Sequence, residues 1–317
     1  MNPPVPASPP TPSAAPAAPS FALARGVVAG ALMAVNTVAL ATPLVLLSLL
    51  KLVLPFAAVR RVLDPVLNFI AERWIDNNGL VLALVQRTAW DVQGVDELRG
   101  GGWVLVTSNH RTWVDILVLQ RVLGHRLPLL KFFLKQELIW VPLLGLAWWA
   151  LDFPFLRRHG PEALKKHPEL KDQDRQSARR ACERFRLTPT SVMTFPEGTR
   201  FTPAKHEATG RKWRHLLPPK SGALAVALDA MGPQLRTGID VTLAYPDGTP
   251  TFWEFVCGRC PRVVVRAREL SLPDTLRAGV GEHPTDSQER RFRAEVQRWI
   301  DEVWRAKDDE LEQLLSR

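Results

Sequence analysis

The longest run of apolar positions stands near the start of the chain. No charged residue occurs from residue 27 to residue 50, and a helix of this length extends about 36 Å, enough to cross the hydrocarbon core of a bilayer. The run is too long for a signal peptide, and no clean small-residue cleavage site follows it. We therefore predict a membrane helix. A second apolar stretch, residues 52–59, contains Pro55 and either extends this helix or folds back as a hairpin that dips into one leaflet.

Beyond residue 62 the apolar runs become short and β-branched, and they alternate with amphipathic stretches. This alternation is typical of an α/β domain. In the last helical stretch, apolar residues recur every three or four positions, so one face of that helix is expected to pack into the core. We predict strands at residues 104–107, 191–195, 239–244 and 262–266, and helices at residues 113–123, 174–185, 221–231 and from about 287 onward.

Residues 138–151 are nearly all apolar and include Trp140, Trp148 and Trp149. Fourteen residues of helix are too few to span a bilayer, so we predict a buried or interfacial helix. Because tryptophan favours membrane interfaces, this segment either lines an acyl-chain channel or packs in the ordinary core.

The composition of the first residues indicates a disordered N-terminal leader, which leads to a division of the chain into three segments. Residues 1–20 are almost entirely Pro, Ala and Ser, which cannot bury enough apolar surface to offset the entropy of ordering. We predict a disordered leader at residues 1–24, a membrane anchor at 25–62, and one α/β domain at 63–317 that ends in an amphipathic helix. The flanking cations Lys51, Arg60 and Arg61 outnumber Arg25, so the side that follows the anchor is expected to face the cytoplasm.

The positive charge is concentrated in one segment. Residues 157–220 contain 16 Lys or Arg and seven Asp or Glu, which accounts for the whole formal charge of +9. Such a segment favours anionic partners: phospholipid head groups, a phosphorylated substrate, coenzyme A, an acidic carrier protein or nucleic acid. Nucleic acid is the weakest of these, since the chain has one Tyr and no aromatic-basic RNA motif.

The three cysteines argue against a disulfide framework, because their number is odd and the chain is long. Cys257 and Cys260 form a single CxxC pair. A structural zinc site usually needs four ligands, so we predict no metal.

The segment NHRTWVD, residues 109–115, follows an apolar strand and carries a candidate base. Acyl transfer to an alcohol requires that the hydroxyl proton be removed as the oxygen attacks, and a neutral imidazole does this near pH 7. His110 is the candidate base. Asp115, five residues on, lies one turn into the predicted helix and is expected to orient the ring, as a carboxylate does in a Ser-His-Asp triad.

The segment FPEGTR, residues 195–200, has a matching layout of strand, stop and turn. Pro196 ends the strand and Gly198 turns the chain, which leaves Glu197, Thr199 and Arg200 projecting. A guanidinium recognises phosphate through two parallel hydrogen bonds, so Arg200 is a candidate phosphate ligand. Glu197 is expected either to hold Arg200 or to accept a glycerol hydroxyl. Further candidate cations are Arg157 and Arg158 after DFPFL, and Lys220 in LLPPKSG.

These segments resemble four ordered blocks of the glycerophospholipid acyltransferases, especially the 1-acylglycerol-3-phosphate acyltransferases. NHRTWVD looks like the HxxxxD block, DFPFLRR like the arginine-bearing second block, FPEGTR like the EGTR block, and LLPPKSG like the Pro-containing fourth block. The resemblance runs from about residue 52 to residue 272 and is greatest to a bacterial inner-membrane subgroup. Asp152 and Pro154 stand near positions where the family commonly has Gly and Ile, so the acceptor head group stays open.

The resemblance implies a mixed-sheet α/β acyltransferase domain on an N-terminal membrane helix or hairpin, with its site on the cytoplasmic side of a bacterial inner membrane. It implies an acyl-CoA or acyl-carrier-protein donor, a lysophospholipid acceptor, and no cofactor or metal. Position by position it implies His110 as base and Asp115 as its partner. It places the acceptor against the remaining residues of these blocks: Arg157, Arg158, Glu197, Gly198, Thr199, Arg200 and Lys220.

The leading hypothesis is therefore acyl transfer to a lysophospholipid, most simply 1-acyl-sn-glycerol 3-phosphate. One alternative is an acyltransferase or transacylase that uses another lysolipid or an amino-acid lipid as acceptor. A second alternative is a membrane-tethered adaptor that binds anionic lipid without chemistry, and it predicts salt-dependent binding that does not depend on His110.

Overall fold

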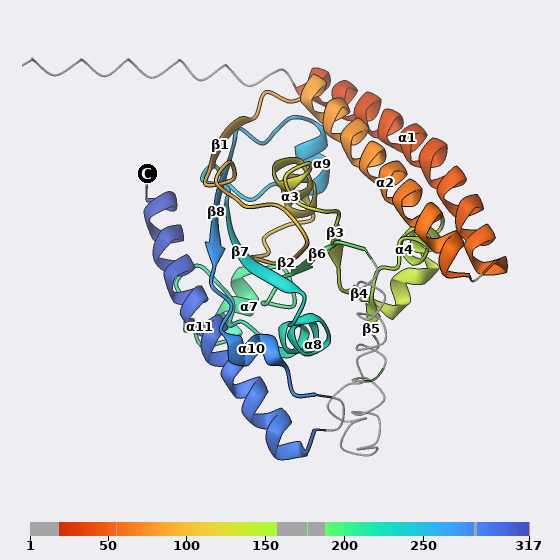
Figure 1. The fold of residues 1–317 in the computed structure, drawn as a ribbon. Helices are drawn as coiled ribbons and strands as arrows, with labels where there is room; N and C mark the ends of the chain where they lie inside the picture. The colour runs from red at the N-terminus through yellow and green to blue at the C-terminus, as the bar shows by residue number, and fades with distance from the viewer. Residues whose placement is uncertain (1–18, 55, 157–175, 177–187, 282–283, 317) are drawn as a thin grey trace, which may run out of the picture.

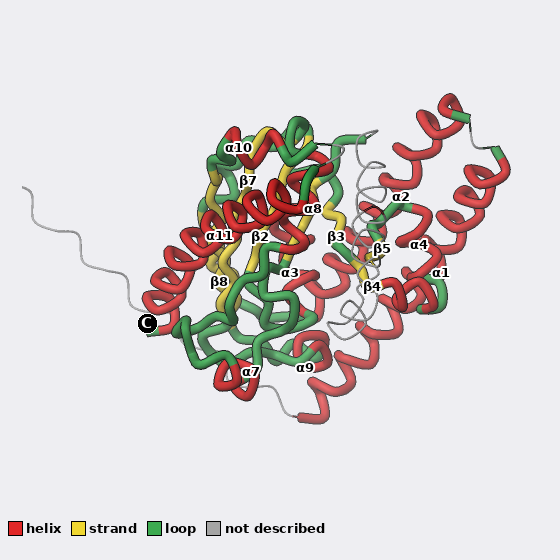
Figure 2. The backbone as a smooth tube through the Cα atoms, turned by 90° about the horizontal axis from the view of Figure 1, so that it is seen from below, coloured by secondary structure: helices red, strands yellow, loops and turns green. Residues whose placement is uncertain are grey.

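A helical hairpin and a mixed α/β domain make up the molecule (Figure 1, Figure 2). The structure is a computed structural model that describes residues 19–54, 56–156, 176, 188–281 and 284–316. Gln176 is the only described residue of the helix predicted at 174–185, so that prediction lies outside the described residues.

The hairpin consists of α1 (Pro19–Val53) and α2 (Ala57–Val85), which run antiparallel along one side of the molecule (Figure 1). Polar side chains fix their register: the Asn36 amide nitrogen donates to Asn78 Oδ1 at 2.9 Å, and the Trp74 indole donates to Thr37 Oγ1 at 3.0 Å. Between the hairpin helices such bonds satisfy groups that would otherwise be buried without partners. The second apolar stretch therefore begins a returning helix, as in the hairpin alternative.

Two boundaries of the predicted domain division differ from the structure. The helix α1 begins at Pro19, so residues 19–24 are helical and do not belong to a disordered leader. The helix α2 passes through residue 62 without a break and ends at Val85, so no structural boundary falls at residue 62. The apolar stripe of α2 is hard to recognise in the sequence because charged residues interrupt it. Its buried members lie on one side of the helix: Leu63, Leu67, Ala71 and Leu82.

Six strands form the main sheet, in the order β1-β8-β7-β2-β6-β3. All neighbours are parallel except β7 and β8, which are antiparallel, so the predicted mixed-sheet α/β class is confirmed. The four predicted strands are present, whereas β1 and β3 were not predicted. The bounds are β1 Ala89–Gln93, β2 Trp103–Ser108, β3 Leu130–Phe132, β6 Ser191–Thr194, β7 Leu235–Ala244 and β8 Arg262–Leu270. A small second sheet pairs β4 (Leu134–Lys135) with β5 (Phe155–Leu156).

Helices cover both faces of the sheet, and the side chains of β2 show why. Leu105 joins the core beneath α8 (Gly222–Met231), α10 (Asp274–Ala278) and α11 (Asp286–Leu315). Val104 and Val106 point the other way, into the core beneath α3 (Val114–Leu123) and α9 (Phe252–Val256). Successive side chains of a strand face opposite sides, so a continuous apolar run is buried on both. The predicted apolar face of α11 is buried, as expected.

The apolar segment at residues 138–151 is not one helix. It forms a 3-10 turn, η1 (Gln136–Trp140), followed by the short helix α4 (Leu144–Ala150). Between them stand Pro142 and Leu143, whose φ of 62° is not helical. Ala147 and Ala150 pack against Leu44 of the hairpin, while Trp140 is 84% exposed. This segment therefore joins the hairpin to the domain.

The cations that follow the first apolar run are used within the protein. Lys51 Nζ lies 2.7 Å from Asp64 Oδ1 and 2.6 Å from Asp152 Oδ2. Arg60 also reaches Asp152, at 2.9 Å. All four side chains are mostly buried, which makes a partner for each charge necessary. Lys51 and Arg60 therefore attach the hairpin turn to the segment after α4.

Candidate active site

The two sequence segments with candidate chemistry meet at one edge of the sheet. Because β2 and β6 are parallel neighbours, the turns that follow Ser108 and Thr194 leave the sheet side by side. The Asn109 side chain exchanges two hydrogen bonds of 2.8 Å with the backbone of Leu243 in β7, which fixes the start of the first turn. His110 follows directly, and its carbonyl accepts a 2.8 Å bond from the Phe201 amide of the other turn.

His110 and Asp115 form the hydrogen-bonded pair that the sequence predicts. Their atoms Nδ1 and Oδ2 are 2.9 Å apart. Asp115 lies in the first turn of α3 and is fully buried, whereas the His110 side chain keeps 14% of its surface exposed. An ionised carboxylate only accepts, so Nδ1 carries the proton and donates it to Asp115. In the neutral imidazole, the other ring nitrogen, Nε2, then carries no proton and is able to accept one.

Asp115 is held by more than the imidazole. Its Oδ2 also accepts backbone N–H groups of Arg111 at 2.6 Å and Thr112 at 3.0 Å. Its Oδ1 accepts the hydroxyl of Tyr245 at 2.7 Å. Four donors therefore hold the Asp115 carboxylate in place. Burial, followed by the neighbouring carboxylate, raises the pKa of Tyr245 far above its ordinary value, so this hydroxyl remains a donor.

A ring stack fixes the plane of the His110 imidazole. Phe195, the first residue of FPEGTR, lies parallel to it with ring centroids 4.0 Å apart and an interplanar angle of 13°. Phe132 at the end of β3 in turn stacks on Phe195, with ring centroids 6.0 Å apart. Stacking on one side and Asp115 at the ring edge leave the imidazole little rotational freedom. Phe195, directly after β6, thus orients the imidazole of His110 on the turn after β2.

Glu197 does not contact Arg200 through any hydrogen bond or ion pair found among the described residues. Instead its Oε1 accepts the backbone N–H of His110 at 2.8 Å, and its Oε2 accepts that of Leu217 at 3.1 Å. The side chain is 1% exposed, and this burial raises the pKa of Glu197 to about 7. Both oxygens face backbone inside the protein, so we interpret Glu197 as a positioning residue and not as a ligand of the acceptor.

The LLPPK segment is fixed against this turn from both sides. The Leu217 carbonyl accepts the Trp304 indole of α11 at 3.1 Å, and the Lys220 amide donates to the Pro196 carbonyl at 2.8 Å. The Lys220 side chain crosses Gly198, because a Cβ at that glycine would lie 3.6 Å from Lys220 Cδ. Gly198 has a φ of 69°, which favours glycine. The third and fourth sequence blocks are therefore adjacent.

The His110 side chain is partly exposed, and cationic side chains stand on the neighbouring turns. We call this exposed surface, which carries Arg200, Lys205 and Lys220, the cationic opening beside His110. Arg200 is exposed and its guanidinium lies 5.0 Å from the ring centre of Trp113. Lys205, at the first turn of α7 (Pro203–Ala208), donates to Thr199 Oγ1 at 2.6 Å and to the Arg200 carbonyl at 3.1 Å. Together with Lys220 these groups can bind an anion such as a phosphate. Arg157 and Arg158 lie outside the described residues.

Arg111 and Tyr245 belong to the site but were missed in the sequence. Arg111 follows the base directly, and its guanidinium lies 4.3 Å from the ring centre of Phe201. Burial lowers the pKa of Arg111, while the carboxylates of Glu197 and Asp115 oppose that shift. The position of Arg111 within NHR was an available signal. Tyr245 gave a weaker one: it is the only tyrosine of the chain and follows a predicted strand directly.

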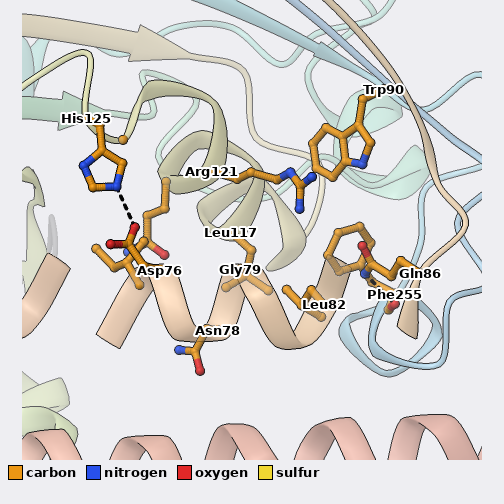
Figure 3. Close-up of a pocket in the computed structure, with 13 residues that line it drawn as sticks. Asp76, Asn78, Gly79, Leu82, Gln86, Trp90, Leu117, Arg121, His125 and Phe255 are labelled. Atoms are coloured by element: carbon orange, nitrogen blue, oxygen red, sulfur yellow. Dashed lines mark hydrogen bonds and ion pairs between the residues drawn. The ribbon is translucent and has the colours of Figure 1, made fainter. Parts of the chain in front are cut away.

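A cavity of about 170 Å³ lies elsewhere, between α2 and α3 (Figure 3). Gly79 and Leu82 of α2 face Leu117 there, and Arg121 lies 4.6 Å from the ring centre of Trp90. This cavity adjoins the C-terminal half of α3, whereas Asp115 lies in its first turn. The cavity therefore belongs to the junction between hairpin and domain and not to the opening beside His110.

Metal ligands are not grouped in the described part of the chain: no three His, Cys, Asp or Glu side chains there are placed to hold an ion. Cys257 and Cys260 are both buried free thiols, and burial raises the pKa of Cys260 to about 11. Packing accounts for this CxxC pair.

A His–Asp pair at the strand ends of a mixed α/β domain, with cationic side chains on the neighbouring turns, has the groups that general-base chemistry on an anionic substrate requires. The acyltransferase family model matches residues 89–246, a range that contains both turns of the site. The chain belongs to the acyltransferase family.

Relatives with assigned names point the same way. The chain is 27% identical over 186 residues to 1-acyl-sn-glycerol-3-phosphate acyltransferase epsilon of Mus musculus, covering 50% of this chain and 47% of the relative. It is 25% identical over 238 residues to 1-acyl-sn-glycerol-3-phosphate acyltransferase 3 of Arabidopsis thaliana, covering 70% and 56%. The chain thus spans about half the length of the curated relatives it matches.

Among solved structures, the chain is similar to the 1-acyl-sn-glycerophosphate acyltransferase of Thermotoga maritima. The alignment covers 88% of this chain and 97% of that one, with 15% identity and a TM-score of 0.43.

Proposed function

We propose that this protein transfers a fatty acyl group from acyl-CoA or acyl-carrier protein to the free hydroxyl of a lysophospholipid. The acceptor that fits best is 1-acyl-sn-glycerol 3-phosphate, and the product is then phosphatidic acid. The single observation that carries the proposal is the hydrogen-bonded His110–Asp115 pair, which stands on a turn bonded to the neighbouring turn that carries Arg200. The names of the relatives support the same acceptor.

The reaction needs one base and no covalent enzyme intermediate. His110 Nε2 removes the proton of the acceptor hydroxyl while that oxygen attacks the thioester carbonyl. The tetrahedral oxyanion then collapses, the carbon–sulfur bond breaks, and the thiolate takes the proton from the imidazolium. Asp115 stabilises the imidazolium during this exchange. The products are an ester and a free thiol, so the chemistry needs no metal or cofactor.

The cationic opening suits the phosphate of the acceptor. Arg200 offers a planar pair of donors, and Lys220 adds a point charge across Gly198. A phosphate there would place the glycerol hydroxyl toward His110. The second block, with Arg157 and Arg158, is expected to complete the phosphate site.

The hairpin is proposed to bind the membrane. One described helix, residues 21–53, is long and apolar enough to cross a bilayer, by length and composition, and 17% of its most apolar window is buried in the protein. It contacts α9 near one end and α4 near the other, which supports a hairpin lying along the membrane in preference to a helix that projects through it. We place the domain on the cytoplasmic face of a bacterial inner membrane, where both donors occur.

The test compares detergent-solubilised wild type with His110→Ala, using lysophosphatidate and an acyl-CoA, with phosphatidate measured by mass spectrometry. Product from wild type and a loss of about 10²–10⁴-fold in the variant are expected. Near-normal turnover by His110→Ala would contradict the base assignment.

A panel of other lysolipids, amino-acid lipids and acyl-carrier protein then decides the acceptor and donor. If wild type forms no product with any pair, the reaction assignment fails, and salt-dependent vesicle binding would favour the adaptor hypothesis.

A further inference from the structure

The apolar face of α1 is largely uncovered by the rest of the protein. Its exposed residues include Val27, Val28 and Leu32, with 56%, 55% and 47% of their surface accessible. The side that faces the domain carries small residues, among them Gly26, Ala29 and Gly30. Small residues allow close approach of another helix. The N-terminal half of α1 therefore has a protein-facing side and an apolar outer side.

The short helix α9 packs on this small-residue side. A Cβ on Gly26 would lie 2.3 Å from Cys257 Sγ, and one on Gly30 would lie 3.8 Å from the Trp253 ring. Ala29 shares a core with Phe255 and Val256. The two helices meet at this point, α9 beside the beginning of α1 (Figure 1, Figure 2). Because α9 packs closely on the small residues of α1, its own exposed surface lies next to the apolar outer side of α1.

Two aromatic residues of α9 remain at the surface. Phe252 is 44% exposed and Trp253 is 45% exposed, whereas Phe255 and Val256 on the same helix are buried. Single exposed apolar residues are common in proteins, but a patch that continues a long apolar helix marks an interaction surface.

The patch reaches the opening of the active site. Thr112 Oγ1 donates to the Pro250 carbonyl at 2.7 Å, which ties the His110 turn to the segment entering α9. Trp113, the next residue, is 52% exposed and carries the Arg200 guanidinium on its ring. Apolar surface thus runs from α1 through α9 to the cationic opening.

We propose that Phe252 and Trp253, together with Trp113, form a membrane-interface patch that seats the active-site opening at the level of the phospholipid head groups. The inference rests on the proposed function and deepens it: the acceptor reaches His110 from the bilayer without passing through water. The aromatic rings extend the anchor onto the catalytic domain itself.

A bilayer fits this patch through continuity and charge. Tryptophan and phenylalanine beside an apolar helix match the boundary between acyl chains and head groups. Cations stand along the same edge, with Arg25 near α9 and Arg200 over Trp113, and they complement the phosphates of an anionic leaflet. Arg25 Cζ would lie 3.9 Å from a Cβ at Gly258, just after α9.

The first experiment compares acceptor in two physical forms. The double variant Phe252→Gln, Trp253→Gln is assayed with long-chain lysophosphatidate in phosphatidylcholine–phosphatidylglycerol vesicles and with a hexanoyl acceptor dissolved as monomer. We expect the apparent KM for the vesicle acceptor to rise about tenfold, because two aromatic contacts with lipid are lost. The kcat/KM for the monomeric acceptor should stay within about twofold. The exchanged variant Phe252→Trp, Trp253→Phe keeps both rings and should behave as wild type.

Equal losses with both acceptors would mean that α9 supports the fold of the site, and they would overturn the proposal. Unchanged kinetics with both acceptors would overturn it as well.

The second experiment does not need acyl transfer, so it separates failure of this proposal from failure of the proposed function. An NBD label is placed at Phe252→Cys, or at Ala306→Cys on the exposed surface of α11, in a Cys182→Ser background that leaves two buried thiols. With vesicles containing doxyl lipids, the label at 252 should be blue-shifted and quenched, and the label at 306 should not.

Equal quenching at the two positions would overturn the proposal. So would a blue shift at 252 without vesicles that grows with protein concentration, because a second copy of the chain would then cover the patch.

Discussion

Asp115 and Glu197 are two buried carboxylates at the same edge of the sheet, yet they act on different things. Asp115 bonds the imidazole of His110 and the hydroxyl of Tyr245, in addition to two backbone amides. Glu197 bonds backbone amides on two chain segments, including that of His110. One carboxylate therefore orients the imidazole of His110, while the other holds the backbone that carries it. The difference teaches that a charged residue in a sequence motif need not meet substrate.

The sharpest test of the comparison is the substitution Asp115→Asn. Asparagine can donate to Nδ1, which would move the imidazole proton to Nε2 and remove the base. We expect kcat to fall by about 10⁴-fold with little change in KM, as for the same change in a Ser-His-Asp triad. The measurement is steady-state kinetics with lysophosphatidate. A fall below about tenfold would mean that Asp115 is structural, as Glu197 is.

Glu197→Gln tests the opposite carboxylate through stability. Glutamine has one acceptor oxygen for two amides, so one amide loses its partner at a cost of about 1–3 kcal/mol. The pH dependence is more specific. Because burial raises the pKa of Glu197 to about 7 in the folded state, the unfolded state binds fewer protons between about pH 4.5 and 7. The stability from this group is full below that window and is lost as pH rises through it.

The check is denaturant unfolding of wild type and Glu197→Gln in detergent at pH 5, 6 and 7.5. The stability of wild type relative to the variant should fall by roughly 3 kcal/mol across the window. A constant difference would show that Glu197 ionises alike in both states.

The sequence predicted the local half of the site and missed the distant half. His110 and Asp115 lie five residues apart, so a strand end and one helical turn suffice to bring them together. Tyr245 reaches Asp115 across 130 residues of chain, and no local pattern marks such a contact. For Glu197 the sequence left two roles open, a contact with Arg200 or a bond to a glycerol hydroxyl, whereas the structure shows bonds to two backbone amides. Such bonds could not be predicted, because they leave no trace in residue types.

The fold shows the same division. Strands β2, β6, β7 and β8 are buried on both faces and read as apolar runs, so the sequence predicts them. The strand β1 is partly exposed with Asp91 and Gln93 in it, and β3 has three residues, so neither gives a clear signal. The helix α2 depends on packing against α1, which no single segment reveals.

The cations at the opening give a smaller effect than either carboxylate. Arg200→Gln should raise KM for lysophosphatidate about 10–100-fold and leave kcat nearly unchanged, because a charged hydrogen bond to phosphate is worth about 1.5–3 kcal/mol. The exposed cation Lys212, next to Trp213, provides the matched control as Lys212→Gln. With a monoacylglycerol acceptor, which lacks phosphate, Arg200→Gln should match wild type. An equal loss on that acceptor would remove Arg200 from the phosphate site.

Tyr245→Phe makes the finest test, because it removes one donor from Asp115 and leaves the other contacts intact. The carboxylate then attracts the imidazole proton more strongly, which stabilises the charged form of His110. We expect kcat to fall by about three- to tenfold, and the acidic limb of the pH profile to move to higher pH. The unpaired Oδ1 remains buried, so the variant should also lose about 1–3 kcal/mol of stability. A loss of stability with an unchanged pH profile would mean that Tyr245 stabilises the fold but does not affect His110. A shifted pH profile would show that Tyr245, like Asp115, affects the imidazole of His110. Glu197 differs from both, because it contacts only the backbone of His110.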